Sequence, residues 1–143
     1  MSVPPYEAIR NLLGGYVEVM DAGDWDGLGA LFEHGKLTDE NGNDVAVGAH
    51  SVRKLYGMLV QLHDGSPLTR HLVTGPVIEV DGDTAVCRSS FLVVQQFGGG
   101  PLQPIAAGRY RDTFAVLDGS WCFTERQFFL EQRGDMSNHL VSG

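Results

Sequence analysis

Basic residues and cysteines are scarce in this sequence. Ten Lys and Arg residues stand against eighteen Asp and Glu residues, and the formal net charge is −8. Because phosphate binding needs clustered Lys and Arg, and the basic residues here are scattered, we expect no nucleic-acid partner. The two cysteines, Cys87 and Cys122, belong to no C-x-x-C or Cys/His spacing and sit in β-like runs, so we expect both to be buried free thiols.

Long apolar runs are missing too. No stretch approaches the roughly 18 apolar residues of a membrane span, and the N-terminus lacks the basic-then-apolar pattern of a signal peptide. We therefore expect a soluble, cytoplasmic protein without a membrane partner. The 143 residues suit a single domain over residues 1–143, since neither an internal repeat nor an interdomain linker interrupts them.

The sequence also lacks the common motifs for nucleophiles, metals and dinucleotides. No G-x-S-x-G, H-E-x-x-H or G-x-G-x-x-G pattern occurs, which argues against acyl transfer, a metal site and a dinucleotide cofactor. The run Gly98–Pro101 follows a predicted strand but opens no helix, so we interpret it as part of a hairpin loop. We expect neither a cofactor nor a metal.

Helices are predicted in the N-terminal part. Apolar residues recur at helical spacing over Ile9–Met20. The flanking Pro4–Pro5 and Ala22–Gly23 suit the start and the end of a helix. A short second helix is predicted over Trp25–Phe32, with its apolar residues on one face.

The middle of the chain is predicted to pass from a hairpin into a third helix. Lys36–Val47 is polar and turn-rich, with a hairpin tip at Glu40–Asp44. The following helix carries its apolar side chains at helical spacing. These residues are Val52, Leu55, Tyr56, Leu59 and Leu62.

Four long strands joined by turns are predicted in the second half. Asp-Gly turns within Val80–Thr84 and Leu117–Trp121 are strong hairpin signals, and Gly98–Pro104 forms a longer loop. The predicted strands are Thr69–Val80, Thr84–Phe97, Ala106–Leu117 and Trp121–Gln132. Helices followed by such a meander indicate an α+β fold. Because the strands exceed the usual length of roughly 5–6 residues, they must curl, which gives a cone-shaped, strongly bent antiparallel sheet capped by three N-terminal helices around a cavity.

Three aspartates close together in the sequence have different predicted roles. Asp24 precedes the second helix and suits its N-cap, and Asp26 lies in the first turn, where negative charge meets the positive helix end. Asp21 lies near the C-terminal end of the first helix, where the dipole disfavours it, and on the edge of the apolar face, four residues after Val17. Burying this carboxylate costs several kcal/mol unless a donor is supplied.

His71 is the best candidate for that donor. It lies near the start of the first long strand, and strand alternation places it on one face with Val73, Val77 and Glu79. A lone strand histidine is most often a satisfied core residue. A buried aspartate that needs a donor and a histidine that needs an orienting acceptor nevertheless fit each other, so we predict that Asp21 and His71 lie within hydrogen-bond reach.

The other histidines have more ordinary interpretations. His34 lies in a loop, and His50 and His63 lie near the start and the end of the third helix, where surface or capping roles are expected. Two interpretations of Glu131–Gly143 stay open: a lid over the pocket mouth, which would bring His139 to the pocket as a second proton carrier, and a surface tail.

Further polar and aromatic residues are candidates for the pocket. Strand alternation places Tyr110 and Asp112 on one face and Arg109 and Arg111 on the other. For Arg111 and Arg126, ion pairs on the outer face of the sheet are the default interpretation. Aromatic residues are expected in the core and the pocket wall. The candidates for contact with a substrate are Tyr16, Trp25, Tyr56, Phe91, Tyr110 and Phe123.

Four segments together resemble the SnoaL-like branch of the nuclear transport factor 2-like superfamily. They are YVEVMDAGDWDGLGALF (Tyr16–Phe32), TRHLVTGPVIEVDGDTAVCRSSFLV (Thr69–Val93), GRYRDTFAVLDGSWCFTER (Gly108–Arg126) and GDMSNHL (Gly134–Leu140). The resemblance implies a cone of bent sheet around an apolar pocket. In members of the scytalone dehydratase and hexachlorocyclohexane dehydrochlorinase types, an aspartate near the end of the first helix pairs with a histidine at the start of the first long strand. The matching residues here are Asp21 and His71.

Acid–base catalysis is the function that this pair implies. Histidine exchanges protons near neutral pH, and a buried carboxylate fixes its tautomer. We expect a cofactor-free dehydratase, eliminase, isomerase or cyclase that acts on a largely apolar small molecule. The alternatives are a non-catalytic binding protein for such a molecule and an assembly subunit resembling the β subunit of ring-hydroxylating dioxygenases. We also expect a homo-oligomer formed through the outer face of the sheet, with a trimer favoured by the resemblance and a dimer as the alternative.

Overall fold

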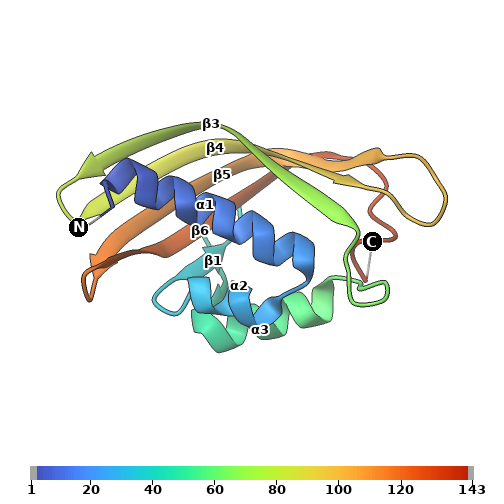
Figure 1. Cartoon of the computed structure of the whole chain (residues 1–143), viewed down its shortest axis with the longest axis horizontal. Coiled ribbons are helices and arrows are strands. Elements are labelled where there is room, and N and C mark those ends of the chain that lie inside the picture. The colour runs from blue at the N-terminus through green and yellow to red at the C-terminus, as the bar shows by residue number, and fades with distance from the viewer. Residues whose placement is uncertain (1–2, 142–143) are drawn as a thin grey trace.

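The structure, a computed structural model, describes residues 3–141, which form three helices and six strands. The helices are α1 (Pro5–Ala22), α2 (Trp25–Leu31) and α3 (Gly48–Leu59). The strands are β1 (Lys36–Thr38), β2 (Asp44–Val47), β3 (Thr69–Asp81), β4 (Thr84–Gln95), β5 (Gln103–Leu117) and β6 (Ser120–Arg133). The α+β class and the three N-terminal helices are as predicted (Figure 1).

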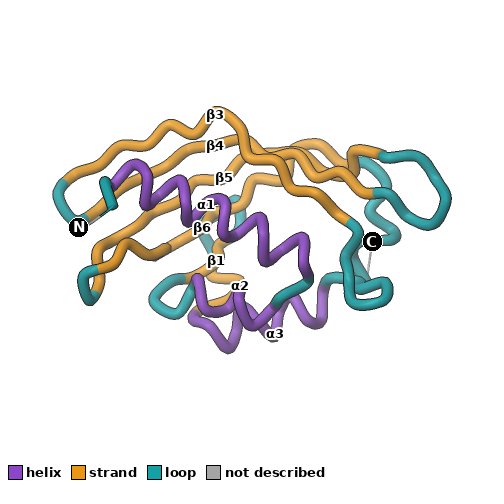
Figure 2. The backbone as a smooth tube through the Cα atoms, viewed as in Figure 1, coloured by secondary structure: helices purple, strands orange, loops and turns teal. Residues whose placement is uncertain are grey.

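All six strands form one bent sheet in the order β2-β1-β6-β5-β4-β3. Strands β3 to β6 make the predicted antiparallel meander. The sheet arches over the helices without closing into a barrel, and α1 lies along β3 on the concave side (Figure 2). Breaks in the pairing register, such as that between Val93 and Val94, are β-bulges, which bend the strands.

The apolar face of α1 packs into the core, as its periodicity predicted. Its buried residues are Ile9, Leu13, Tyr16 and Met20. The helix ends at Gly23, whose positive φ of 68° lets backbone N–H groups bond carbonyls of the last turn. Asp21 therefore lies in this last turn, beside the buried face. Asp24 accepts a hydrogen bond from the backbone N–H of Gly27 at 2.9 Å and is the predicted N-cap of α2.

The polar segment Lys36–Val47 forms the predicted hairpin, and its two short strands, whose bounds the sequence did not predict, join the sheet. β1 and β2 form an antiparallel hairpin around a tip at the predicted position, and β1 pairs in parallel with β6. The sheet is therefore mixed rather than purely antiparallel. Strands of 3 and 4 residues are too short to show an alternating pattern.

The third helix is shorter than its apolar spacing predicted. α3 ends at Leu59, because Val60 is extended and pairs with Leu140 in an isolated bridge. Leu62 lies outside the helix and is exposed. His63 also lies beyond the helix end, and instead of capping it, its ring Nε2 donates to a carbonyl of the C-terminal segment at 2.8 Å.

A bulge in β3 reverses the predicted alternation of its second half. The register with β4 shifts between Thr74 and Val77. His71 and Val73 share a face as predicted, but Val77 and Glu79 point to the exposed face. An extra residue in one strand moves every following side chain to the opposite face, so the prediction for these two residues was wrong.

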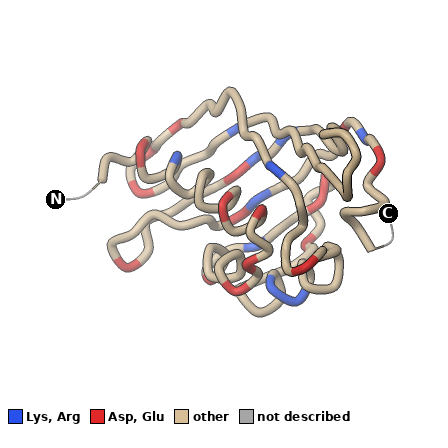
Figure 3. The backbone as a smooth tube through the Cα atoms, turned by 45° about the vertical axis from the view of Figure 1, so that its right-hand side comes forward, with Lys and Arg blue, Asp and Glu red and all other residues tan. Residues whose placement is uncertain are grey.

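Three further features concern the whole fold. Cys87 is buried and Cys122 only partly buried, and both are free thiols. Basic residues are dispersed over helices and strands, with acidic residues between them (Figure 3). Within residues 3–141, no helix combines the length and the apolar character that a membrane crossing requires.

Candidate active site

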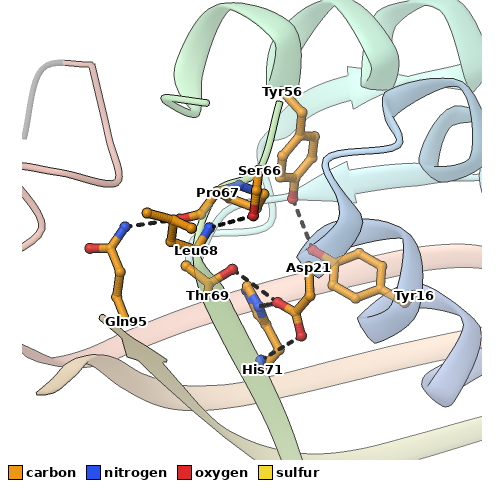
Figure 4. Close-up of polar contacts among 9 residues, drawn as sticks. All are labelled: Tyr16, Asp21, Tyr56, Ser66, Pro67, Leu68, Thr69, His71 and Gln95. Atoms are coloured by element: carbon orange, nitrogen blue, oxygen red, sulfur yellow. Dashed lines mark hydrogen bonds and ion pairs between the residues drawn. The ribbon is translucent and has the colours of Figure 1, made fainter. Parts of the chain in front are cut away.

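Asp21 and His71 meet where the last turn of α1 passes the start of β3 (Figure 4). The Nδ1–H of the His71 ring donates to Oδ1 of Asp21 at 2.6 Å, and the backbone N–H of His71 donates to Oδ2 at 2.9 Å. The Thr69 hydroxyl donates to Oδ1 at 3.0 Å. The exposed fraction is 7% for the Asp21 side chain and 6% for that of His71. The contact expected from the sequence is thus present.

The surroundings of Asp21 keep its carboxylate ionised. Burial raises the pKa of Asp21, but the hydrogen bonds from the His71 ring and backbone, the charge of His71 and the Thr69 hydroxyl together outweigh burial, so the pKa lies below its ordinary value. An ionised carboxylate only accepts hydrogen bonds, so the proton of a neutral His71 ring resides on Nδ1. Its lone pair then lies on Nε2, which is the atom able to accept a proton.

The C-terminal segment packs against this part of the fold. Of the predicted lid or tail Glu131–Gly143, the first residues belong to β6 and the last two, 142–143, lie outside the described residues. The side-chain amide of Gln61 donates to the carbonyls of Ser137 and Leu140 at 2.7 and 2.8 Å. Met136 is buried in the smaller of the two apolar clusters. The segment 134–141 is therefore anchored to the rest of the fold through buried Met136 and through its backbone carbonyls, while several of its other residues are exposed.

His139 is brought beside His71 by this packing. It is 7% exposed, and the two ring centroids lie 6.4 Å apart. Burial, followed by the proximity of His71, lowers the pKa of His139 to about 4, so its ring is neutral at pH 7. Its Nδ1 has no hydrogen-bond partner among residues 3–141.

The aromatic residues predicted as substrate contacts fill the inside of the bent sheet. Phe91 stacks on Tyr110 with ring centroids 4.6 Å apart, and the hydroxyls of Tyr16 and Tyr56 lie 3.0 Å apart (Figure 4). Trp25 packs against Tyr56 at 5.8 Å between centroids. Phe123 is fully buried in the larger apolar cluster. Tyr16 also packs edge-on against Tyr110, with ring centroids 6.1 Å apart.

A buried ion pair completes this interior. Arg126 donates through Nε and Nη2 to the two carboxylate oxygens of Asp112 at 2.8 and 2.9 Å, and both side chains are 0% exposed. The guanidinium carbon lies 3.7 Å from the ring centre of Tyr110 and 4.2 Å from that of Tyr16. Burial disfavours the charge, but Asp112 raises the pKa of Arg126 above its ordinary value.

The default interpretation of Arg126 was therefore wrong. It pairs inside the sheet rather than on the outer face, because it lies directly opposite Asp112, whose inward direction follows from alternation with Tyr110. Arg109 does lie on the outer face, where it pairs with Glu131 at 2.8 Å. The signal available in the sequence was the shared face of Asp112 and Tyr110, which places a carboxylate in the core and demands a cation beside it.

A groove beside His71 lies between α1 and β3. Its volume is about 420 Å³, and its walls are formed by α1 residues between Arg10 and Glu18 and by His71, Val73 and Pro76 of β3. The aromatic residues predicted as substrate contacts are not among the residues that line it. Within residues 3–141, no three His, Cys, Asp or Glu side chains gather as a metal site would require.

Comparisons with known proteins identify relatives of two kinds. The β subunit of the methanesulfonate monooxygenase hydroxylase of Methylosulfonomonas methylovora is 32% identical over 147 residues, covering 89% of this chain and 81% of the relative. A solved structure of a proposed scytalone dehydratase from Novosphingobium aromaticivorans has a TM-score of 0.71 at 24% identity, covering 91% of this chain and 86% of that one. The β subunit of a proposed aromatic-ring-hydroxylating dioxygenase from the same species has a TM-score of 0.67 at 20% identity, covering 88% of each chain.

The two solved structures show the shared fold, in agreement with the fold that the resemblance implied. A family model for the SnoaL-like domain matches residues 2–127, which is most of the chain. The chain therefore belongs to the SnoaL-like domain family.

Proposed function

We propose that this protein is a cofactor-free acid–base enzyme that acts on a largely apolar small molecule through His71 and Asp21. The observation that carries the proposal is the 2.6 Å hydrogen bond from Nδ1 of His71 to a nearly buried carboxylate, which leaves Nε2 as a base. Burying a carboxylate is unfavourable unless donors compensate, and here the donors come from the start of β3. The same arrangement orients the histidine of a Ser-His-Asp triad.

The proposed reaction begins when Nε2 of His71 removes a proton from a carbon of the substrate. Asp21 stays ionised and stabilises the imidazolium. The electron pair of the broken C–H bond then either expels a leaving group from the adjacent carbon or shifts to another position. In the first case His71 gives its proton to the leaving group, which is elimination or dehydration; in the second it returns the proton to a different carbon, which is isomerisation.

Proton exchange at carbon can be tested without the natural substrate. The full chain is incubated in D₂O with a panel of small apolar ketones and carboxylic acids, and deuterium uptake at carbon is followed by mass spectrometry. General acid–base catalysis contributes about 10²–10⁴-fold, so His71→Gln should label at least about 100-fold more slowly than wild type. A wild-type chain that labels no member of the panel, or a His71→Gln variant that labels at the wild-type rate, contradicts the proposal.

Two variants separate catalysis from a purely structural contact. Thr69→Val removes one hydrogen bond to Asp21 but leaves the bond to the His71 ring, so labelling should persist. His63→Gln changes a histidine between α3 and β3 that bonds the C-terminal segment rather than Asp21, and it should label at the wild-type rate. If His71→Gln and Thr69→Val lose labelling equally, the contact only holds α1 against β3.

A second candidate function is an assembly subunit of a multicomponent oxygenase. It is favoured by the 32% identity to a hydroxylase β subunit. Leu72 and Val77, which are 44% and 47% exposed on the outer face of the sheet, would then contact a larger subunit. Co-purification with a larger iron-containing chain, together with no labelling in D₂O, would favour this function. A chain that binds apolar molecules alone and labels none would instead be a binding protein.

A further inference from the structure

The groove between α1 and β3 gives His71 a route to the outside. Its volume of about 420 Å³ lies within the roughly 300–1,000 Å³ of small-molecule pockets. Inside the bent sheet, Tyr16, Tyr110 and Arg126 pack against one another. On another side, His139 covers the His71 ring. The groove is therefore an open space that reaches His71, which is one of the residues lining it.

The groove is deepened by Gly14, a glycine on the α1 wall that has no side chain. Arg10, Gly14 and Glu18 are spaced by four residues, so they form one ridge along α1. A Cβ placed on Gly14 would meet no atom within 4 Å, which shows that the space above it is open. Any larger residue at this position would extend into the groove between Arg10 and Glu18.

The two ends of the groove differ in chemistry. His71 lies at the Glu18 end, because it bonds Asp21 in the next turn of α1. Arg10 lies at the other end, about 12 Å from Glu18 along the helix axis at a rise of 1.5 Å per residue, and it forms no ion pair within residues 3–141. Between the ends, the walls are apolar: Leu13, Val17, Val73 and Pro76.

These features define the kind of molecule that the groove suits. Apolar walls bind an apolar body, and an unpaired guanidinium at one end attracts an anion. Glu18 at the His71 end repels an anion and so orients the molecule, with its acidic group toward Arg10 and its reacting carbon toward His71. Building on the proposed function of His71, we propose that the groove between α1 and β3 is the substrate site and that it takes elongated, largely apolar organic acids.

The test uses 1-anilinonaphthalene-8-sulfonate, an apolar aromatic acid, as the probe in fluorescence titrations of the full chain. Wild type should bind it saturably. Gly14→Leu should bind at least about tenfold more weakly, a difference of about 1.4 kcal/mol. Gly15→Leu is the matched control, because Gly15 is the neighbouring helical glycine, also has open space at its Cβ, and does not line the groove. Arg10→Gln should weaken binding and reduce its salt dependence.

The outcomes separate this inference from the proposed function. Three results overturn the groove as the site. Wild type does not bind the probe saturably, Gly14→Leu keeps the wild-type affinity to within twofold, or Gly15→Leu loses as much affinity as Gly14→Leu. The deuterium labelling of the panel acids tests His71 independently. Labelling that needs His71 but is not slowed by Gly14→Leu also overturns the groove, whereas probe binding that needs the Gly14 gap in a chain with no labelling supports the groove and refutes the chemistry. Circular dichroism confirms folding, since leucine replaces glycine in a helix in both variants.

Discussion

Replacing Asp21 with asparagine should destabilise the fold at neutral pH. In wild type, Oδ1 accepts from the His71 ring and Thr69, and Oδ2 accepts from the His71 backbone. Asparagine has one oxygen and one NH₂ group. With the NH₂ at the Oδ2 position it faces the backbone N–H of His71, and with the NH₂ at the Oδ1 position it can be accepted only by the His71 tautomer that has a bare Nδ1, so the charge-assisted bond from the ring is lost in both orientations. The loss of a charge-assisted hydrogen bond in a nearly buried site costs about 1.5–3 kcal/mol, and we expect a destabilisation of that size.

The pH dependence of this loss has a definite sign. The pKa of Asp21 is lowered in the folded state, so its stabilising contribution is present above the pKa of the unfolded chain and is lost as the pH falls through the folded value. The difference in free energy of unfolding between wild type and Asp21→Asn should therefore be largest at neutral pH and shrink in acid.

Urea unfolding followed by circular dichroism from pH 3 to pH 8 measures both quantities. Asp26→Asn is the control, because Asp26 is exposed and pairs with Arg53 at 3.3 Å on the surface. Such pairs contribute about 0–1 kcal/mol. Two results would show that Asp21 is not the ionised, hydrogen-bonded group described above. One is a free energy of unfolding of Asp21→Asn within about 0.5 kcal/mol of wild type at pH 7. The other is a difference in free energy of unfolding from wild type that does not change with pH.

Three further predictions concern the C-terminal segment and the assembly. The pKa of His139 is lowered from 6.5 to about 4 in the folded chain. As the pH falls from 6.5 to 4, this histidine is therefore protonated in the unfolded chain but not in the folded one, which removes up to about 3 kcal/mol of stability. His139→Gln should flatten that slope in unfolding curves, and an unchanged slope would show that the ring is not buried neutral. Truncation after Arg133 removes buried Met136 and His139 and should lower stability by about 3 kcal/mol or more; equal melting temperatures would mean that the segment does not pack. Light scattering at micromolar concentration should give a multiple of 15.5 kDa, with a trimer favoured, and a monomer mass would refute assembly through the outer sheet face.

The sequence predicted the helices and strands that show local periodicity. It also predicted the contact of Asp21 with His71, because a carboxylate is unfavourable at the position of Asp21. The apolar spacing of α1 and the Asp-Gly turns between long strands suffice for most of the fold. Asp21 was recognisable because a carboxylate in the last turn of an amphipathic helix has no local compensation. That need, matched with a histidine at the start of a strand, was enough to predict the contact with His71.

Other features depend on packing that a sequence does not encode in a local pattern. The bulge between Thr74 and Val77 contains Gly75–Pro76, a pair that marks an irregular strand, but the change in the face that Glu79 occupies follows only from the register with β4. The pairing of Arg126 with Asp112 depends on the register of two strands. Whether aromatic side chains line a cavity or fill it depends on their rotamers and contacts, which periodicity does not determine.

The central claim is that Asp21 orients His71 as a proton acceptor, and nuclear magnetic resonance of the ¹⁵N-labelled chain tests it most directly. Long-range ¹H–¹⁵N correlations distinguish a protonated from an unprotonated ring nitrogen in each histidine, and comparison with His71→Gln assigns the signals of His71. For the neutral ring, the hydrogen bond to Asp21 predicts a proton on Nδ1 and a bare Nε2. A neutral His71 ring that carries its proton on Nε2 would contradict the claim, because Nε2 would then have no lone pair with which to accept a proton.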